Sequence, residues 1–327
     1  TMLDGLMYIA TDQGLDIIDM ETLANVDNDL TEAVGTLRIR CIIKDSKDNL
    51  WLCTYGEGIW KVSGSDIVKF NSTNSEVGNR VRLCKELSDG TIIVSSDEGL
   101  AYIKGEEVIN SIPIGSDGFS STVTLTLSQI SDGTILAGTD GSGLYLIKNG
   151  KVVDHISRKD GLTSEVILRT VTDIDGESSF IVTSNGICYM DKDGNVKELP
   201  NIPYFNNFDI TINDKGKLFI LGSAGIYVVD RAQLLAGDEV SYTLLNPGSG
   251  LTGRITSNSW NYYDEDDKNL YISTDLGVFA VDTLSYSKGS KSYRMTVKEV
   301  TLNYVPYTIE RGVPLNIGKD INRIEFV

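Results

Sequence analysis

Short apolar runs recur along the chain, and each is followed within a few residues by a glycine and another apolar residue. The pattern occurs seven times, with 39 to 52 residues between successive glycines. These glycines are Gly14, Gly58, Gly99, Gly143, Gly186, Gly225 and Gly277. A tandem repeat of roughly 40 to 50 residues built from short strands is typical of a β-propeller, with one repeat per blade. The spacing therefore predicts an all-β fold with seven blades.

Each repeat is predicted to form four antiparallel strands joined by tight turns. In the fifth repeat, Asp175-Gly176 lies between two apolar runs, and most other repeats carry Asp-Gly or a related pair at this place. Such residues tolerate the positive φ that tight hairpins need. The repeated glycine is expected to adopt a positive φ as well. No amphipathic helix of ten or more residues is expected, although 231–236 is compatible with one helical turn.

The first repeat differs from the other six, because 3–30 supplies only its second, third and fourth strands. An unpaired inner edge would be costly. We therefore expect the ring to be closed either by residues upstream of Thr1 or by the segment 292–297.

Several segments resemble a known family. The repeat copy at 45–59 resembles the two-component regulator propeller (Reg_prop) repeat, and 161–166 resembles the segment that leads into a new blade of that family. The tail at 295–304 and 321–326 resembles the start of the β-sandwich that follows these propellers, the three-tyrosine (Y_Y_Y) domain. The resemblance implies a seven-bladed propeller at 1–289 and the N-terminal part of an Ig-like β-sandwich at 290–327.

The chain is acidic, with 29 Lys and Arg against 46 Asp and Glu and a formal net charge of −17. This charge disfavours nucleic acid and anionic membranes as partners, because binding phosphates needs clustered cations. The simplest role for the acids is to solubilise turns and outer strands. Neither a signal peptide nor an apolar stretch long enough to span a bilayer is recognisable in the sequence. Both ends look like cuts within a longer protein. The family resemblance implies an extracytoplasmic part of a membrane-anchored protein, and the chain itself is not expected to insert into the membrane.

Catalytic machinery is hard to identify. The single histidine, His155, is expected on an outer strand at the surface, and no Gly-x-Ser-x-Gly elbow presents a nucleophile. The cysteines lack metal-ligand spacing, so no metal or cofactor is expected. A disulfide between Cys41 and Cys53 is conceivable, but buried free thiols are favoured. These four cysteines are Cys41, Cys53, Cys84 and Cys188.

Two motif matches are interpreted as structural. The glycines of 248–253 satisfy the dinucleotide-binding pattern, but a strand approach follows them instead of a helix. The segment 191–195 resembles part of a calcium loop but lacks its full ligand set, because Ile202 stands at the twelfth position. We interpret 191–195 as a hairpin turn.

The mouth of the central channel is the expected binding site, since loops there surround a concave surface. Aligned repeats place Arg82, Arg169, Asp209 and Trp260 at one position, and Arg80, Ile167, Asn207 and Asn258 two residues earlier. Arg40, Tyr204, Phe205 and Arg254 are expected near the same rim. Such side chains suit a sugar, because aromatic rings stack on sugar faces while amides and charges form hydrogen bonds. The alternative is that these residues pair with one another around a water-filled channel. The candidate ligand-binding residues are Arg40, Arg80, Arg82, Arg169, Tyr204, Asn207, Asp209, Arg254, Asn258 and Trp260.

Three classes of function are compatible with the sequence. The resemblance implies a non-catalytic sensor domain of a membrane-spanning bacterial signalling protein, with a histidine kinase or diguanylate cyclase output elsewhere. It would bind an oligosaccharide or another small polar ligand and pair as a homodimer in the full-length protein. The alternatives are a propeller enzyme acting on polysaccharide, which needs paired carboxylates, or a protein-interaction scaffold that uses 260–263.

Overall fold

The structure is a computed structural model that describes residues 1–116, 118–121, 123–203, 206–237, 239–257, 259–286, 299–308 and 319–326. The chain divides into two compact units, Thr1–Ser287 and Lys288–Val327. Each unit is described separately below. The segment 292–297, proposed above to close the ring, lies outside the described residues.

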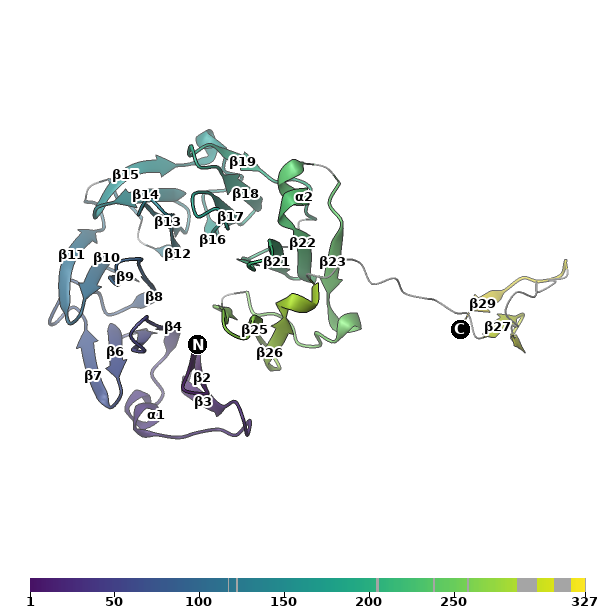
Figure 1. Ribbon diagram of the computed structural model, residues 1–327, viewed down its shortest axis with the longest axis horizontal. Coiled ribbons are helices and arrows are strands. Elements are labelled where there is room, and N and C mark those ends of the chain that lie inside the picture. Colours follow the sequence, from purple (N-terminus) through teal and green to yellow (C-terminus); the bar gives the residue numbers. More distant parts are fainter. Residues whose placement is uncertain are drawn as a thin grey trace. The chain divides into compact units, whose positions relative to one another are not determined.

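The described part of the first unit contains seven antiparallel sheets that follow one another along the chain and surround a central axis (Figure 1). The second to sixth sheets have four strands each, whereas the first and seventh have three. Within each sheet, strands that are consecutive in sequence are hydrogen-bonded neighbours. The predicted all-β fold is confirmed, and so is the four-stranded meander for the second to sixth repeats.

The strands of the first three sheets have these bounds. The first sheet contains β1 (Met2–Leu3), β2 (Leu6–Thr11) and β3 (Gly14–Asp19). The second contains β4 (Ile39–Lys44), β5 (Leu50–Thr54), β6 (Ile59–Ser63) and β7 (Asp66–Phe70). The third contains β8 (Val81–Glu86), β9 (Ile92–Ser96), β10 (Gly99–Lys104) and β11 (Glu107–Pro113).

The other four sheets of this unit follow in the same way. The fourth contains β12 (Thr124–Gln129), β13 (Ile135–Thr139), β14 (Leu144–Lys148) and β15 (Lys151–Ile156). The fifth contains β16 (Ile167–Thr172), β17 (Ser179–Thr183), β18 (Gly186–Met190) and β19 (Val196–Glu198). The sixth contains β20 (Asp209–Ile212), β21 (Lys217–Gly222), β22 (Gly225–Asp230) and β23 (Tyr242–Leu245). The seventh contains β24 (Tyr262–Tyr263), β25 (Asn269–Thr274) and β26 (Gly277–Asp282).

The first sheet has a short inner strand that the sequence did not predict. In β1, Met2 and Leu3 pair with Met7 and Leu6 of β2. The Tyr8 amide also donates to the Thr1 carbonyl over 2.9 Å. The chain itself therefore covers part of the edge that was expected to lie open.

Helices are few and short among the described residues. They are α1 (Asp29–Val34), α2 (Arg231–Ala236), η1 (Arg158–Asp160), η2 (Pro247–Ser249) and η3 (Thr283–Tyr286). The single turn predicted at 231–236 is confirmed as α2. The sequence analysis missed α1, whose signal is the Asn28 side chain that accepts hydrogen bonds from Leu30 and Thr31 at its N-terminus.

The repeated position requires glycine for two reasons: a backbone carbonyl comes close to it, and its φ is positive. At Gly58, φ is +75°, and a Cβ would overlap the Phe70 carbonyl of the fourth strand in the same sheet. Four of the seven glycines meet a carbonyl of the fourth strand in this way: Gly58, Gly99, Gly143 and Gly225. At Gly14 the close carbonyl is that of Gly35, directly after α1. A positive φ was expected at all seven and is absent at Gly186.

The core lies between neighbouring sheets. Trp51 of the second sheet, Leu83 of the third and Tyr145 of the fourth are almost fully buried in one continuous cluster. The indole of Trp51 also donates to Asp45 over 2.8 Å, while the other Asp45 oxygen accepts the Lys47 and Asn49 amides of the hairpin turn. The Asp and Trp of this repeat thus tie the β4–β5 turn to the core.

The second unit contains one described sheet. Its strands are β27 (Glu299–Leu302), β28 (Val305–Thr308) and β29 (Ile324–Phe326), with β27 in the middle. The predicted β-sandwich at 290–327 would need a second sheet and stays a prediction.

Candidate functional site

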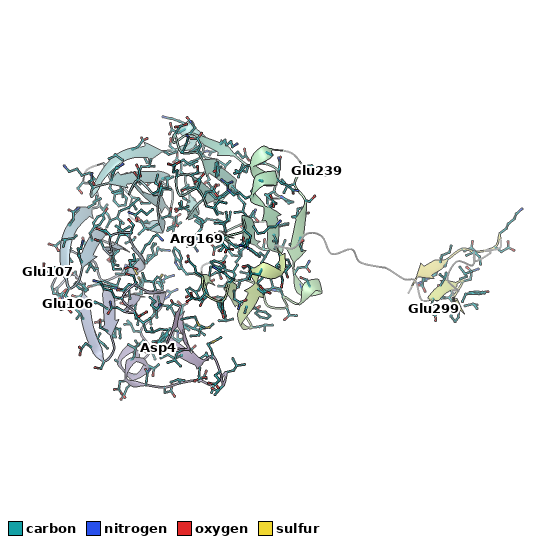
Figure 2. All side chains as sticks on the ribbon, viewed as in Figure 1. Asp4, Glu106, Glu107, Arg169, Glu239 and Glu299 are labelled. Atoms are coloured by element: carbon teal, nitrogen blue, oxygen red, sulfur yellow. The ribbon has the colours of Figure 1, made fainter. Side chains whose placement is uncertain are left out.

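The residues predicted to line the channel mouth fall into two groups in the structure. Arg169, Asp209 and Trp260 form one group near the centre of the ring, where Figure 2 labels Arg169. Arg40, Arg80 and Arg82 form the other, around Tyr55 between the second and third sheets. Tyr204, Phe205 and Asn258 lie outside the described residues.

The side chains of the central group contact one another. Arg169 Nε donates to Asp209 Oδ1 over 2.7 Å, and the guanidinium carbon lies 3.6 Å from the centroid of a Trp260 ring. The second Asp209 oxygen accepts from Asn261 Nδ2 over 2.6 Å. Arg169 and Asp209 are 8% and 4% exposed, so little of either is open to a ligand. This pairing is the alternative that the sequence analysis left open for these residues.

Asn207 and Arg254 lie apart from this network. Asn207 is buried, with its Nδ2 bonded to the Pro203 carbonyl over 3.4 Å and its Oδ1 without a hydrogen-bond partner. Arg254 is exposed, and its backbone amide donates to Asp275 Oδ1 over 2.7 Å.

The sequence alignment of the inner strands was wrong by one residue at Arg80 and Arg82. In β8, Val81 pairs with Ser96 and Leu83 with Ser95, so Arg82 is the extra residue of a β-bulge. In β16, Ile167 pairs with Thr183 and Arg169 with Val182. Arg169 therefore corresponds to Leu83, and Ile167 to Val81. Since a one-residue shift turns a side chain to the other face of a strand, Arg80 and Arg82 do not join Arg169 in the centre.

The second group is assembled by a loop that docks on the next sheet. Tyr55 directly follows β5, and its amide donates to the Arg38 carbonyl over 2.9 Å. The next residue, Gly56, donates to the Asn79 carbonyl over 2.8 Å, and Tyr55 forms a β-bridge with Arg80. Tyr55 is thereby held between the starts of two inner strands.

Each of these inner strands brings two arginines to Tyr55. Arg38 and Arg40 flank buried Ile39, and Arg80 and Arg82 flank buried Val81. Arg40, like Arg82, is the extra residue of a β-bulge, a feature that re-aims side chains near functional sites.

The ring of Tyr55, which is 43% exposed, collects three of the four guanidinium groups. Their central carbons lie 5.7, 5.4 and 5.3 Å from the ring centroid for Arg38, Arg40 and Arg80 respectively. Each such cation–π contact contributes about 0.5–1 kcal/mol at an exposed site. The ring thus offsets part of the repulsion among like charges.

A hollow of about 310 Å³ opens beside this cluster. Its wall includes Arg40, Tyr55, Arg80, Arg82, Ser95, Asp97 and Thr124. A further hollow of about 540 Å³ shares Tyr55 and also contains Arg38, Trp60 and Lys69. In that hollow, Lys69 Nζ lies 3.7 Å from the centroid of the Trp60 ring, and the buried Trp60 Nε1 has no hydrogen-bond partner.

The surroundings of Arg40 disfavour its charged form. Partial burial lowers the pKa of its guanidinium and the positive charges of Arg38 and Arg82 lower it further, against a smaller opposing effect of Asp12 and Tyr55. In contrast, Arg38 has a carboxylate partner, because its Nε contacts Asp12.

The sequence analysis missed Tyr55 and Arg38. A signal was present, because the residue directly after the second strand is aspartate in four other repeats, at Asp12, Asp97, Asp140 and Asp275. An aromatic residue at this place is the exception. Comparing loop positions across repeats, rather than inner strands alone, would have identified Tyr55.

Four local structural interpretations from the sequence are confirmed. His155 is exposed on β15 and stacks on Tyr145, with 4.5 Å between ring centroids. The four cysteines are buried and free, and Cys41 and Cys53 lie opposite each other in β4 and β5. The segment 191–195 is a hairpin turn in which Asp191 accepts from the Asn195 amide. After 248–253 the chain continues to the β-bridge of Ile255 with Thr274.

Two further features were searched for within the described residues. No group of three or more His, Cys, Asp or Glu side chains in that part of the chain is placed to hold a metal ion. The same residues include no helix of the length and apolar character that crossing a bilayer requires.

Comparison with known proteins supports the repeat assignment. The family model described as two component regulator propeller (Reg_prop) matches residues 34–56, which include α1's last residue, β4, β5 and Tyr55. The resemblance to that repeat is therefore confirmed there, whereas the resemblance of the tail to the three-tyrosine domain stays a prediction. Curated protein sequences gave no match.

Two similar solved structures are extracellular domains of putative hybrid two-component systems, BT3049 and BT4673 of B. thetaiotaomicron. For BT3049 the TM-score is 0.74 at 16% identity, over 97% of this chain and 42% of that chain. For BT4673 the TM-score is 0.67 at 14% identity, over 93% of this chain and 42% of that chain. The present chain thus spans about two fifths of the length of these structures.

An enzyme shares the architecture as well. The virginiamycin B lyase of Staphylococcus aureus, solved with quinupristin, has a TM-score of 0.60 at 13% identity, over 85% of this chain and 91% of that chain. At such identities, these three likenesses show the fold alone.

Proposed function

We propose that this chain is an extracytoplasmic ligand-sensing domain of a membrane-anchored two-component signalling protein. The kinase or cyclase output would lie in another part of that protein. One observation carries the proposal: Tyr55 and arginines that have no carboxylate partner among the described residues line a hollow beside the repeat that matches the two-component regulator propeller family. Aromatic and guanidinium groups together suit a carbohydrate or another small polar ligand.

Pairing of two chains is part of this proposal. A ligand changes a signalling equilibrium only if it binds one of two states more tightly than the other. A ring of packed sheets offers few alternative internal states, so we expect the two states to differ in how two copies of the protein associate.

An enzyme is the second candidate, favoured by the fold it shares with a lyase. Glycoside hydrolysis needs two carboxyl groups, typically about 5–10 Å apart. The described lining of the 310 Å³ hollow contains one carboxylate, Asp97, whose Oδ1 already accepts the Arg80 amide over 3.0 Å. This arrangement supports binding better than hydrolysis.

A thermal-shift screen with a panel of oligosaccharides separates the classes. A ligand at 100 times its dissociation constant stabilises the folded chain by about 2.7 kcal/mol, which raises the melting temperature by several degrees. A glycan that stabilises the chain and is recovered uncleaved supports the sensor. Turnover supports the enzyme, and the absence of any response supports a protein-interaction scaffold.

A further inference from the structure

We propose that the hollow beside Tyr55 binds an anionic sugar, with its carboxylate or sulfate group held by Arg40, Arg80 and Arg82. This proposal rests on the proposed sensing function and specifies its ligand. Guanidinium groups hold such anions through paired, charge-assisted hydrogen bonds.

None of the three arginines forms an ion pair or a side-chain hydrogen bond within the described part of the chain. Among the described residues, the exposed Arg158 and Arg254 also lack ion pairs, but only the three arginines of the proposal line one hollow together. Other arginines have carboxylate partners: Arg169 with Asp209, Arg231 with Asp173, and Arg323 with Glu325. In a chain with a net charge of −17, unpaired cations gathered at one hollow indicate an anionic partner that is not part of the chain.

The propeller does not need arginines at this place. An equivalent junction links the fourth and fifth sheets, where the Asp140 amide donates to the Val123 carbonyl and Asp140 forms a β-bridge with Val166. Gly141 donates to Glu165 there, as Gly56 does to Asn79. Valines thus occupy the positions of Arg38 and Arg80, and Asp140 the position of Tyr55, with the same backbone geometry. At the bulge positions of Arg40 and Arg82 that junction carries Leu125 and Leu168. The fold therefore needs none of the three arginines, which are free to serve a ligand.

The rest of the wall suits a sugar. Ser95 and Thr124 belong to the wall of the hollow, and their hydroxyl groups form no hydrogen bond with another described residue. Together with Asp97 they can donate to and accept from the hydroxyl groups of a sugar ring. The volume of about 310 Å³ lies at the small end of the range for ligand pockets, which fits one or two sugar rings.

Calorimetric titration of the 327-residue chain tests the proposal. The probes are galacturonate, glucuronate and mannuronate, the 6-sulfated forms of the parent hexoses, and the neutral hexoses. Comparing the uronates with the sulfated sugars shows whether the arginines hold a carboxylate or a sulfate group. We expect at least one acidic sugar to bind at least 10-fold more tightly than its neutral counterpart, and the binding to weaken as salt rises.

Variants locate the binding. Arg40→Gln, Arg80→Gln and Arg82→Gln should each weaken binding of the acidic sugar about 10- to 100-fold, since each removes a charge-assisted hydrogen bond. Arg158→Gln, at an exposed arginine on η1, is the matched control and should leave the affinity unchanged. Within the described residues none of the three arginines forms an ion pair, so the melting temperature of the free Arg82→Gln variant should stay close to the parent value. Arg40→Gln and Arg80→Gln each lose a contact with the Tyr55 ring and should melt only slightly lower.

Three results would overturn the proposal: equal binding of neutral and acidic sugars, unchanged affinity in all three variants, or no binding of any acidic sugar. If neutral oligosaccharides stabilise the chain while the acidic sugars fail, the sensing function stands and only the anionic ligand is wrong. If no glycan in either experiment binds, both proposals fail.

Discussion

Two buried tyrosines show how the surroundings of one hydroxyl group decide its contribution to stability. The Tyr189 hydroxyl donates to Asp173 Oδ2 over 2.6 Å, whereas the buried Tyr102 hydroxyl has no hydrogen-bond partner. At pH 7 we expect Tyr189→Phe to cost about 1–3 kcal/mol, while Tyr102→Phe is neutral or stabilising by up to about 1 kcal/mol. Urea unfolding of both variants measures the difference. A larger loss for Tyr102→Phe would contradict this assignment.

The Tyr102 hydroxyl also makes the stability of the chain depend on pH. Burial raises the pKa of Tyr102 from 10.0 to about 12. The unfolded chain therefore loses this proton near pH 10 while the folded chain keeps it, so stability falls as pH rises from 10 toward 12. We expect Tyr102→Phe to lose stability more slowly than the parent chain across this window. Unfolding free energies at pH 9, 10 and 11 test the expectation, and parallel losses in both proteins would refute it.

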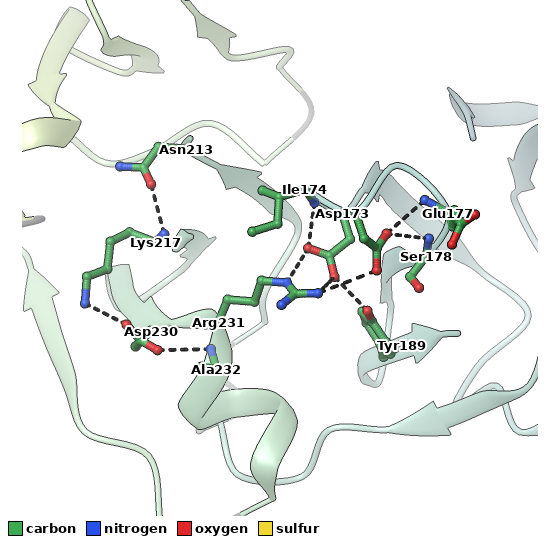
Figure 3. A network of polar contacts seen from close by, with 11 residues as sticks. Asp173, Ile174, Glu177, Ser178, Tyr189, Asn213, Lys217, Asp230, Arg231 and Ala232 are labelled. Carbon is green, nitrogen blue, oxygen red and sulfur yellow. Dashed lines mark hydrogen bonds and ion pairs between the residues drawn. The ribbon is translucent and has the colours of Figure 1, made fainter. Parts of the chain in front are cut away.

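An ion pair between Arg231 and Asp173 connects the fifth and sixth sheets (Figure 3). Arg231, the first residue of α2, donates from Nε and Nη2 to the two oxygens of Asp173 over 2.6 Å each. Since the Asp173 side chain is fully buried, Arg231→Met should leave an unpaired charge and cost about 3 kcal/mol. Arg158→Met, at an exposed arginine without an ion pair, should stay within about 0.5 kcal/mol. Adding Asp173→Asn should recover part of the loss, and a double variant no better than Arg231→Met would argue against an unpaired charge as the cause.

At the scale of elements, the sequence predicted the features that depend on residues close together in the chain, such as the hairpin turns. The turn residues Asp48 and Lys268 have positive φ, as hairpins of these lengths require. Register was harder to predict. Strands β8 and β16 carry the same bulge, but the third repeat has Leu87 where the fifth has Asp173, so aligning Glu86 with Asp173 shifts the count by one residue. The contact between Arg40, Arg80 and Tyr55 depends on a loop docking on the next sheet, which no single repeat encodes.

The two glycines that flank strand β6 test whether glycine is needed because a carbonyl comes close to it, and not only because its φ is positive. Gly58 and Gly64 both have positive φ, but a Cβ overlaps the Phe70 carbonyl only at Gly58 and meets open space at Gly64. We expect Gly64→Ala to cost about 1 kcal/mol from its backbone conformation. Gly58→Ala should cost at least about 2 kcal/mol more, because the β6–β7 pairing must shift. Chemical denaturation compares the two, and equal losses would show that φ alone matters.

At the scale of the whole molecule, the inner strands pack against their neighbours, as β4, β8, β12 and β16 do in succession. This packing makes a large internal change on binding costly. If the proposed sensing function holds, ligand should change the oligomeric state of the extracytoplasmic portion of the longer protein, with little change inside the propeller. Light scattering and interdomain distance measurements with and without ligand test this. A monomer whose distances stay constant at saturation would exclude the mechanism.

The docked loop that carries Tyr55 also bears on how new specificities arise. The backbone contacts at this junction recur where Asp140 replaces Tyr55. The side chains proposed to bind a ligand can therefore change while the fold of the junction stays the same. Grafting Leu125→Arg, Asp140→Tyr, Val166→Arg and Leu168→Arg, the counterparts of Arg40, Tyr55, Arg80 and Arg82, should create a second anion-binding cleft without loss of the fold. Lineages of such propellers could then diversify by exchanging a few loop residues while the sheets between them stay unchanged.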